Sequence, residues 1–352
     1  MDNKVTYILK DDADVRANLL PITYTRPISE IRIGITTIRE KWQRELGDVP
    51  MTYSTVEYLS EKFPCRVSTS ESVEIEAHQV PGVGRIEHLY DIFLLNGKAI
   101  EADFDAITAG RQSQPLSDTC TVIGDPRRIF IEEGATVEGA MLNTKDGPIY
   151  VGRDAEIMEG SCVRGPMALC DHAVLKMGTK VYGGTTIGPW CKVGGELSNV
   201  VMQAYSNKAH DGFLGNAVIG EWCNLGAGCV ASNLKNDYTE IKLWNYPAQR
   251  FVRTGLQFCG VIMGDHTKCG INTMLNTATV LGVGVNIHGS GFPRPFVASF
   301  SESGGAGYVD VSMTKFFDIA SRMMARRHIE LTEADKRIFY AVREIAENYR
   351  YS

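Results

Sequence analysis

Residues 151–193 read VGRDAEIMEGSCVRGPMALCDHAVLKMGTKVYGGTTIGPWCKV, and every sixth position in this stretch is aliphatic. These positions are Val151, Ile157, Val163, Leu169, Leu175, Val181, Ile187 and Val193. A period of six matches neither the helical repeat of about 3.6 residues nor the two-residue alternation of a strand. It is typical of a triangular coil, in which each flat side is a short strand and each corner is a turn. The stretch therefore predicts a parallel β-helix of six-residue repeats, with the aliphatic side chains stacked inside.

The same pattern continues on both sides of this stretch. Aliphatic or similar residues recur at Ile131, Val137, Ile219, Leu225, Met263, Cys269, Leu275, Leu281 and Ile287. We therefore expect the β-helix to extend from about Ile129 to Gly291. Residues 197–216 and 232–260 break the register. Insertions in a solenoid often leave as loops on the binding face, so these two interruptions are the expected place of the functional site.

The composition is that of a globular protein. The chain has 352 residues, 44% of them hydrophobic and 22% charged, with a net charge of −6. This balance gives no support for nucleic-acid binding. No apolar run approaches the roughly 18 residues of a membrane helix, so no membrane partner is expected. The N-terminus lacks a signal-peptide pattern and the nine cysteines include no C-x-x-C pair. We therefore expect a cytoplasmic protein with no metal site.

The regions that flank the repeats have different patterns. Residues 1–115 predict a small α/β domain, with strands at 5–9 and 51–55 and helices at about 34–46 and 56–63. Residues 116–300 form the β-helix domain. Residues 301–352 predict a helical tail that caps the open end of the solenoid. In an alternative interpretation, Arg322, Arg326 and Arg327 of this tail contact the phosphates of coenzyme A.

The repeats resemble the left-handed β-helix of hexapeptide-repeat acyltransferases. The resemblance implies a left-handed coil and a homotrimer with active sites between neighbouring β-helices. Residues 206–233 read SNKAHDGFLGNAVIGEWCNLGAGCVASN. They resemble the acetyltransferase domain of the bifunctional N-acetylglucosamine-1-phosphate uridyltransferase/glucosamine-1-phosphate acetyltransferase family. The pattern there is S-K-x-x-H-x-x-Y-x-G-D-A-x-I-G, followed by N-x-G-A-G-x-x-x-x-N-Y.

This resemblance implies a set of site residues. His210 takes the place of the catalytic base, and Asn224 and Asn233 take the places of catalytic asparagines. Acyl transfer from a thioester needs a base that deprotonates the attacking group, and it needs donors that stabilise the oxyanion. The implied substrate-binding residues are Lys192, Lys208, Asp211 and Phe213, and the implied acetyl-CoA contacts are near Ile271 and Gly289.

The sequence also departs from the family. Phe213 and Leu234 replace tyrosines, and an expected lysine falls at about Gln203. Loss of a charged phosphate ligand is costly, because charge-assisted hydrogen bonds are worth about 1.5–3 kcal/mol. These departures favour either a substrate other than glucosamine 1-phosphate or a loss of activity.

The N-terminal region resembles a shortened sugar nucleotidyltransferase domain. Leu20-Pro21-Ile22-Thr23 matches the family's L-P-L-T, and Arg26-Pro27 matches its K-P. The resemblance implies that Arg16 and Arg26 contact a nucleotide, with Mg²⁺ if the domain is active. The glycine-rich loop is replaced by residues 10–14, KDDAD, whose aspartates would repel phosphates. A degenerate packing or regulatory domain, or an altered phosphate site that uses Arg16, Arg26 and Arg32, remains open.

Three functions follow as hypotheses. The first is an acetyl-CoA-dependent acetyltransferase that acts on an amino sugar phosphate or a nucleotide sugar, with His210 as general base. The second is an NTP-dependent sugar-1-phosphate nucleotidyltransferase that uses the N-terminal domain. The third is a non-catalytic, trimeric scaffold that binds sugar phosphates.

Overall fold

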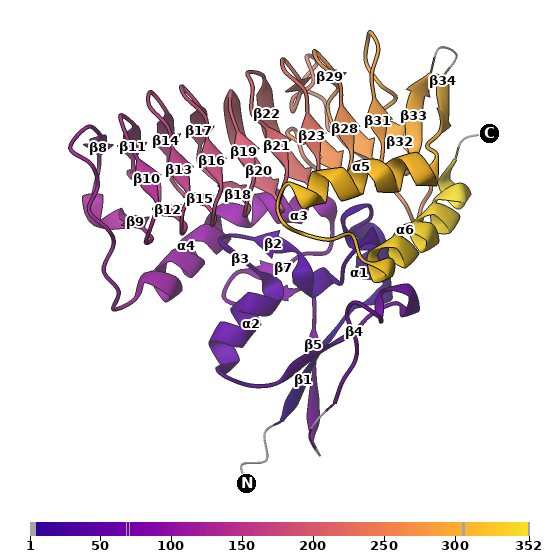
Figure 1. The fold of residues 1–352 in the computed structure, drawn as a ribbon, viewed down its shortest axis with the longest axis horizontal. Helices are drawn as coiled ribbons and strands as arrows, with labels where there is room; N and C mark the ends of the chain where they lie inside the picture. Colours follow the sequence, from indigo (N-terminus) through magenta and orange to yellow (C-terminus); the bar gives the residue numbers. More distant parts are fainter. Residues whose placement is uncertain (1–4, 68, 70, 305–306, 351–352) are drawn as a thin grey trace.

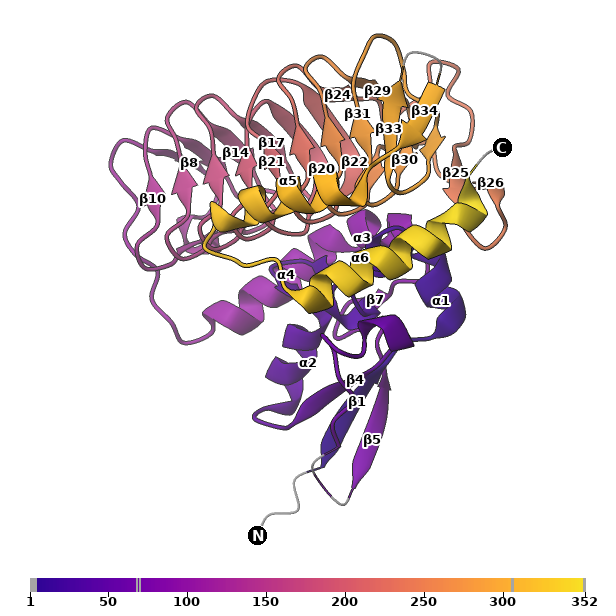
Figure 2. The same ribbon diagram turned by 45° about the vertical axis from the view of Figure 1, so that its right-hand side comes forward.

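The computed structural model describes residues 5–67, 69, 71–304 and 307–350. A long parallel β-helix forms one layer, and a smaller α/β part lies against it (Figure 1). Two C-terminal helices lie across both (Figure 2). The predicted combination of α/β part, parallel β-helix and C-terminal helices is therefore confirmed. Among the described residues, no helix is both long and apolar enough to cross a membrane.

The β-helix has three sides, which we number in chain order within a coil. The first side contains β10 (Thr136–Val137), β13 (Glu156–Ile157), β16 (Val174–Leu175), β19 (Lys192–Val193), β21 (Asn207–Lys208), β23 (Asn224–Leu225), β28 (Lys268–Cys269), β31 (Asn286–Ile287) and β33 (Ser301–Gly304), with β34 (Gly307–Asp310) antiparallel at its end. The second side contains β8 (Thr121–Ile123), β11 (Met141–Asn143), β14 (Cys162–Arg164), β17 (Lys180–Tyr182), the first halves of β20 (Glu196–Met202) and β22 (Phe213–Ile219), β24 (Val230–Ala231) and β29 (Met274–Leu275). The third side contains β9 (Ile129–Ile131), β12 (Ile149–Val151), β15 (Met167–Leu169), β18 (Thr185–Ile187), the second halves of β20 and β22, β27 (Ile262–Met263), β30 (Val280–Leu281) and β32 (Phe296–Val297).

The aliphatic repeat fills the interior of the coil. All eight positions from Val151 to Val193 are buried, and equivalent positions on adjacent strands pair in register, as Leu175 does with Val193. Stacking of this kind is what a single coil cannot achieve alone. The predicted role of the six-residue repeat is therefore confirmed.

The first interruption does not leave the solenoid as a loop, contrary to the sequence-based expectation. Its residues stay in the coil and the coil becomes shorter. Leu175 pairs with Val193, 18 residues later, but Val193 pairs with Lys208 after only 15. Asn199 and Asn216 adopt φ of 55° and 45° at a corner, which asparagine tolerates better than most residues. Each turns the chain within one residue, so β20 and β22 extend over two sides.

The second interruption does leave the solenoid, but it serves packing. It contains the hairpin β25 (Lys242–Asn245) and β26 (Arg250–Arg253). Trp244 stacks on Phe296 with ring centroids 4.2 Å apart, and Tyr246 meets Tyr24 of the N-terminal part edge to face at 5.7 Å. The part of the expected polar binding loop around Trp244 and Tyr246 is thus a buried aromatic contact between two parts of the chain.

The N-terminal part is built on a three-stranded parallel sheet in the order β4 (Met51–Ser54), β1 (Thr6–Lys10), β5 (Ser72–Glu76). Its other elements are α1 (Ala13–Asn18), α2 (Ile38–Leu46), α3 (Leu89–Leu94), α4 (Asn96–Thr108) and the hairpins β2 (Arg32–Ile33) with β3 (Thr36–Thr37) and β6 (Gln79–Val80) with β7 (Gly84–Arg85). The helix expected at 56–63 is only a 3₁₀ turn at Glu57–Leu59. Pro64 disfavours helical backbone at the residue before it, which limits this segment.

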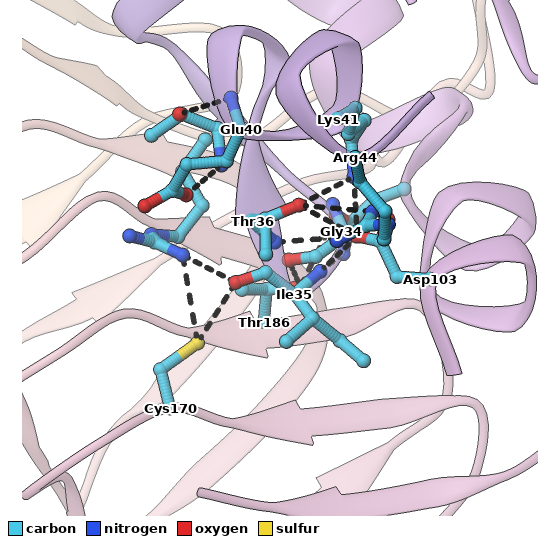
Figure 3. A network of polar contacts seen from close by, with 12 residues as sticks. Gly34, Ile35, Thr36, Glu40, Lys41, Arg44, Asp103, Cys170 and Thr186 are labelled. Atoms are coloured by element: carbon cyan, nitrogen blue, oxygen red, sulfur yellow. Dashed lines mark hydrogen bonds and ion pairs between the residues drawn. The ribbon is translucent and has the colours of Figure 1, made fainter. Parts of the chain in front are cut away.

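A polar network fixes the N-terminal part to the third side (Figure 3). The Asp103 carboxylate accepts from the backbone N–H of Ile35 at 2.7 Å and pairs with Lys41 and with Arg44. The Thr186 hydroxyl of β18 donates to the Gly34 carbonyl at 2.9 Å. Burial lowers the pKa of Lys41 to about 8, although Asp103 opposes the shift. The two layers are therefore joined by specific hydrogen bonds as well as by apolar packing.

The C-terminal helices do not cap the open end of the solenoid as expected. Helix α5 (Met313–Ala325) runs along the β-helix, and α6 (Glu333–Ala346) crosses onto the N-terminal part (Figures 1 and 2). The corner between the third and first sides carries stacked rings at left-handed positions, which we call the ring corner: His172, Trp190, Tyr205, Trp222 and His266. Phe316 of α5 and Phe339 of α6 both contact His266. This aromatic contact accounts for the lengthwise position of α5.

Candidate functional site

His210 lies on an exposed corner of the solenoid. It occupies the turn between β21 on the first side and β22 on the second side. The corresponding turn two coils further on contains Ile271, which is 73% exposed, and the next contains Gly289. We call this corner the His210 edge. The structure thus places the expected base and both expected acetyl-CoA contacts on one edge.

Asn224 and Lys192 lie in a row on the adjoining first side. Cα pairing aligns Lys192 with Asn207 and Asn207 with Asn224 on adjacent strands. The Asn207 Nδ2 donates to the Asn224 Oδ1 at 2.9 Å, which leaves the Asn224 Nδ2 as the donor for a ligand. The row therefore offers polar groups beside the His210 edge.

Asn233 lies at a different corner. It follows β24, where the second side ends, and its Nδ2 donates to the Asn216 Oδ1 at 2.8 Å. His210 is at the opposite end of the second side, so the structure does not bring these two residues of one chain together. Phe213 begins β22 and points outward on the second side, and Asp211 is exposed beside His210.

Lys208 does not reach a ligand, which corrects the role expected for it. Its side chain occupies the interior column and is 1% exposed. The ammonium group donates to the carbonyl oxygens of Gly194 at 3.0 Å and His210 at 2.7 Å. Burial lowers the pKa of Lys208 to about 8. Lys208 therefore fastens the turn that carries His210 from inside the coil.

The expected nucleotide-binding arginines are held by carboxylates of the chain itself. Arg16 is 5% exposed and pairs with Asp11 at 2.9 Å. Asp11 also accepts from the backbone N–H of Ile28 at 2.9 Å. Arg26 pairs with Asp265 and, at 3.0 Å, with Glu221. The two arginines that were expected to bind a nucleotide phosphate are therefore already paired with carboxylates of this chain.

The same contacts bear on Mg²⁺. Asp12 accepts from the backbone N–H groups of Asp14 and Val15, both at 3.0 Å, and so caps α1. Asp11 is occupied by Arg16 and Thr55. The Asp11 carboxylate is therefore not available to an oxygen-ligated magnesium ion, whereas Asp12 uses only its Oδ1 for the helix cap.

A cavity at the junction of the three parts of the chain was not predicted. It has a volume of about 300 Å³. Its wall includes Arg26, Arg32, Glu221, Trp222, His266 and Phe339. Burial, together with Lys268, Lys62 and Arg26, holds the pKa of His266 well below its ordinary value. These residues are far apart in the sequence and form no local motif, so only the packing of the three parts reveals the cavity.

A β-helix with an exposed histidine edge, joined to a small α/β part, defines a fused hexapeptide-repeat and nucleotidyltransferase-like architecture. Residues 7–84 match the sugar nucleotidyl transferase family. The chain is similar to the bifunctional protein GlmU of Alkaliphilus metalliredigens, with 27% identity over 188 residues, 46% of this chain and 41% of that protein. The resemblance inferred from the motifs is therefore confirmed.

Two other relatives are also named as bifunctional proteins. The bifunctional sugar-1-phosphate nucleotidylyltransferase/acetyltransferase of Sulfurisphaera tokodaii is 27% identical over 144 residues, 40% of this chain and 35% of that protein. The GlmU protein of Bartonella quintana is 21% identical over 231 residues, 62% of this chain and 44% of that protein. The matched region spans less than half of the length of each of these relatives.

One solved structure that matches this chain is the UDP-N-acetylglucosamine acyltransferase from Campylobacter jejuni. The match has 12% identity and covers 64% of this chain and 95% of that chain, at a TM-score of 0.26.

Proposed function

We propose that this protein is a cytoplasmic acetyltransferase that uses acetyl-CoA to acetylate the amine of an amino sugar phosphate or nucleotide sugar. His210 is the general base. The single observation that carries the proposal is the position of His210 on an exposed edge, with its turn fastened from inside by Lys208 at 2.7 Å. A base held in this way is already positioned for proton transfer before the substrate binds.

The chemistry follows from the groups on and beside the edge. Acetyl-CoA, held along the edge near Ile271 and Gly289, would supply an acetyl group activated as a thioester. His210 removes a proton from the acceptor nitrogen as the new C–N bond forms. It then gives this proton to the sulfur as the C–S bond breaks. The Asn224 Nδ2 and backbone N–H groups of the edge are suitable donors to the oxyanion.

The position of Asn233 supports a homotrimer as part of this proposal. Within one chain Asn233 lies at a different corner from His210. A second copy of the chain, packed against the second side, would supply its own Asn233 to the site. The proposed site is therefore shared between copies.

The test compares two histidines changed in the same way. His210→Asn should lower acetyl transfer at least about 100-fold, because a positioned general base contributes about 10²–10⁴-fold. His88→Asn is the control, because it removes an imidazole from the N-cap of α3, a position that asparagine favours. The measurement is the release of free thiol from acetyl-CoA with glucosamine 1-phosphate and a panel of other amino sugars. Equal rates in both variants, or no thiol release with any acceptor, would sink the proposal.

The two other hypotheses are less well supported by the contacts. Nucleotidyl transfer needs cations for the phosphates of a nucleotide, and Arg16 and Arg26 are engaged by Asp11, Asp265 and Glu221. A non-catalytic scaffold would bind sugar phosphates without releasing thiol, so the same assay separates it from the acetyltransferase.

A further inference from the structure

Four positively charged side chains gather where the end of α5 meets the solenoid. Lys192 belongs to β19 on the first side, and Lys176 directly follows β16 of the same side. Arg326 is the C-terminal cap of α5, and Arg327 follows it. We call these four residues the basic patch. The whole chain has a net charge of −6, so the charge of this patch is opposite in sign to the net charge of the molecule.

Two parts of the chain converge at one coil to form the patch. The Arg327 guanidinium lies 5.8 Å from the centroid of the Trp190 ring. Trp190 stacks on His172 at 4.2 Å and immediately precedes the coil segment that leads into Lys192. The backbone N–H of Lys176 donates to the Val193 carbonyl at 2.7 Å, which places Lys176 beside the same strand. Lys192 thus lies near both the end of α5 and Lys176.

The charges of the patch act on one another. Burial and the positive charges of Arg327, Lys176 and Arg326 lower the pKa of Lys192, and Glu156 opposes them weakly from two strands away. Within the described part of the chain, none of the four cations has a carboxylate at ion-pair distance. The Arg327 Nε is buried without a hydrogen-bond partner. The patch therefore holds repulsion that an anion would relieve.

The end of a helix explains only half of this arrangement. Cations near a helix C-terminus gain from the negative end of the helix dipole, which accounts for Arg326 and Arg327. Lys176 and Lys192 are on the solenoid and add repulsion to the same place. A structural role for the helix end therefore leaves the convergence of all four cations unexplained.

We propose that the basic patch binds a phosphate or diphosphate group of a ligand of this enzyme. The identity of that ligand rests on the proposed function, which offers two sources: the phosphate of the sugar acceptor and the phosphates of coenzyme A. Two guanidinium forks and two ammonium groups suit phosphate oxygens. The row Lys192, Asn207 and Asn224 leads from the patch towards the His210 edge, so a bound phosphate would align the rest of the ligand along the first side.

The experiment is calorimetric titration of the full chain with pyrophosphate, glucosamine 1-phosphate, coenzyme A and dephospho-coenzyme A. The double variant Arg326→Gln/Arg327→Gln and the variant Lys192→Gln should each weaken binding by about tenfold or more, as expected for the loss of charge-assisted hydrogen bonds. Arg327→Lys should give an intermediate loss, because the charge remains but the fork is lost. Lys242→Gln is the matched control, since Lys242 is an exposed lysine at the start of β25, away from the patch. Its affinity should equal that of the wild type.

The arms of the titration identify the source of the phosphate. Binding of glucosamine 1-phosphate that depends on the patch assigns it to the acceptor. Patch-dependent binding of coenzyme A and dephospho-coenzyme A assigns it to the donor, and a patch-dependent preference for coenzyme A assigns it to the ribose phosphate that dephospho-coenzyme A lacks. Circular dichroism spectra show whether each variant is folded. If the arginine double variant does not fold, Lys192→Gln still tests the patch, because it leaves α5 unchanged.

The outcomes also separate this inference from the proposed function. If none of the four compounds binds, or if the patch variants bind as tightly as the wild type and Lys242→Gln, the patch is not a phosphate site. If patch-dependent binding is found but no acceptor is acetylated, the phosphate site stands and the acetyltransferase proposal fails.

Discussion

At the residue scale, Lys208 has a different role from the one expected, because the coil that contains it is short and places its side chain in the interior. On the adjacent strand Val193 occupies the equivalent interior position, and Leu225 occupies it on the next. The two backbone carbonyls that receive the Lys208 ammonium belong to Gly194 and His210. A buried ammonium is tolerated only when it is hydrogen-bonded in this way. Its effect on stability should therefore depend on pH.

We expect the change Lys208→Met to reveal this dependence. The pKa of Lys208 is lowered to about 8 in the folded chain. Between pH 8 and about 10.4, where an unfolded lysine titrates, the unfolded chain binds more protons than the folded chain at this residue, so its contribution to stability rises with pH. The free energy of unfolding of the wild type should rise relative to Lys208→Met across this range, by on the order of 1–3 kcal/mol. Urea denaturation at several pH values measures it. A flat difference for Lys208→Met would contradict the buried position of this side chain.

The interior positions could be predicted from the sequence, but this lysine could not. The six-residue period is visible because each aliphatic side chain has the same neighbours in every coil. The short coil depends on the left-handed backbone of Asn199 and Asn216, and many asparagines adopt other conformations. The motif around His210 therefore identified a candidate base, but it assigned Lys208 to the substrate when it belongs to the interior.

At the level of elements, one aromatic side chain, Phe316, makes the main contacts that hold α5 in place. Phe316 is 5% exposed and contacts the rings of Phe300, His266 and Phe339. The apolar face of this helix was visible in the sequence. Its partner was not, because the ring corner is formed by residues that lie about one coil apart.

Phe316→Ala should therefore destabilise the protein by about 3–5 kcal/mol, the usual cost of removing a buried phenylalanine. Tyr340→Ala on α6 is the control, since Tyr340 is exposed, and should cost well under 1 kcal/mol. Both values follow from chemical denaturation. A small loss for Phe316→Ala would mean that α5 does not dock on the ring corner in solution.

At the scale of the whole molecule, the three parts of the chain share one apolar core. A single cluster of buried residues includes Phe93 of the N-terminal part, Val218 of the solenoid and Phe339 of α6. The ion pairs of Arg26 with Asp265 and Glu221 cross the same junction. No pattern in the sequence could connect residues this far apart, so the junction cavity and its charges required the structure.

Arg26→Gln tests whether this junction is structural. It leaves two carboxylates without their cation, and breaking a buried pair in this way costs about 3–5 kcal/mol. The double change Arg26→Met/Asp265→Leu should recover part of the loss, because no unpaired charge then remains at Asp265, whereas Glu221 still lacks its cation. Urea denaturation of the single and double variants gives the coupling. Equal stability of Arg26→Gln and the wild type would show that Arg26 is open to solvent and available to a ligand.

The sides of the solenoid are covered to different extents, and this difference affects which cysteines can be labelled in solution. The N-terminal part covers the third side, whereas the second side keeps Met141, Cys162 and Tyr182 exposed. Cys65 and Cys162 are the exposed thiols among the nine cysteines, and only Cys162 is on the solenoid. A maleimide reagent would thus find one target on the N-terminal part and one on the open side. Whichever of the two is protected when copies of the chain associate identifies the surface by which they do so.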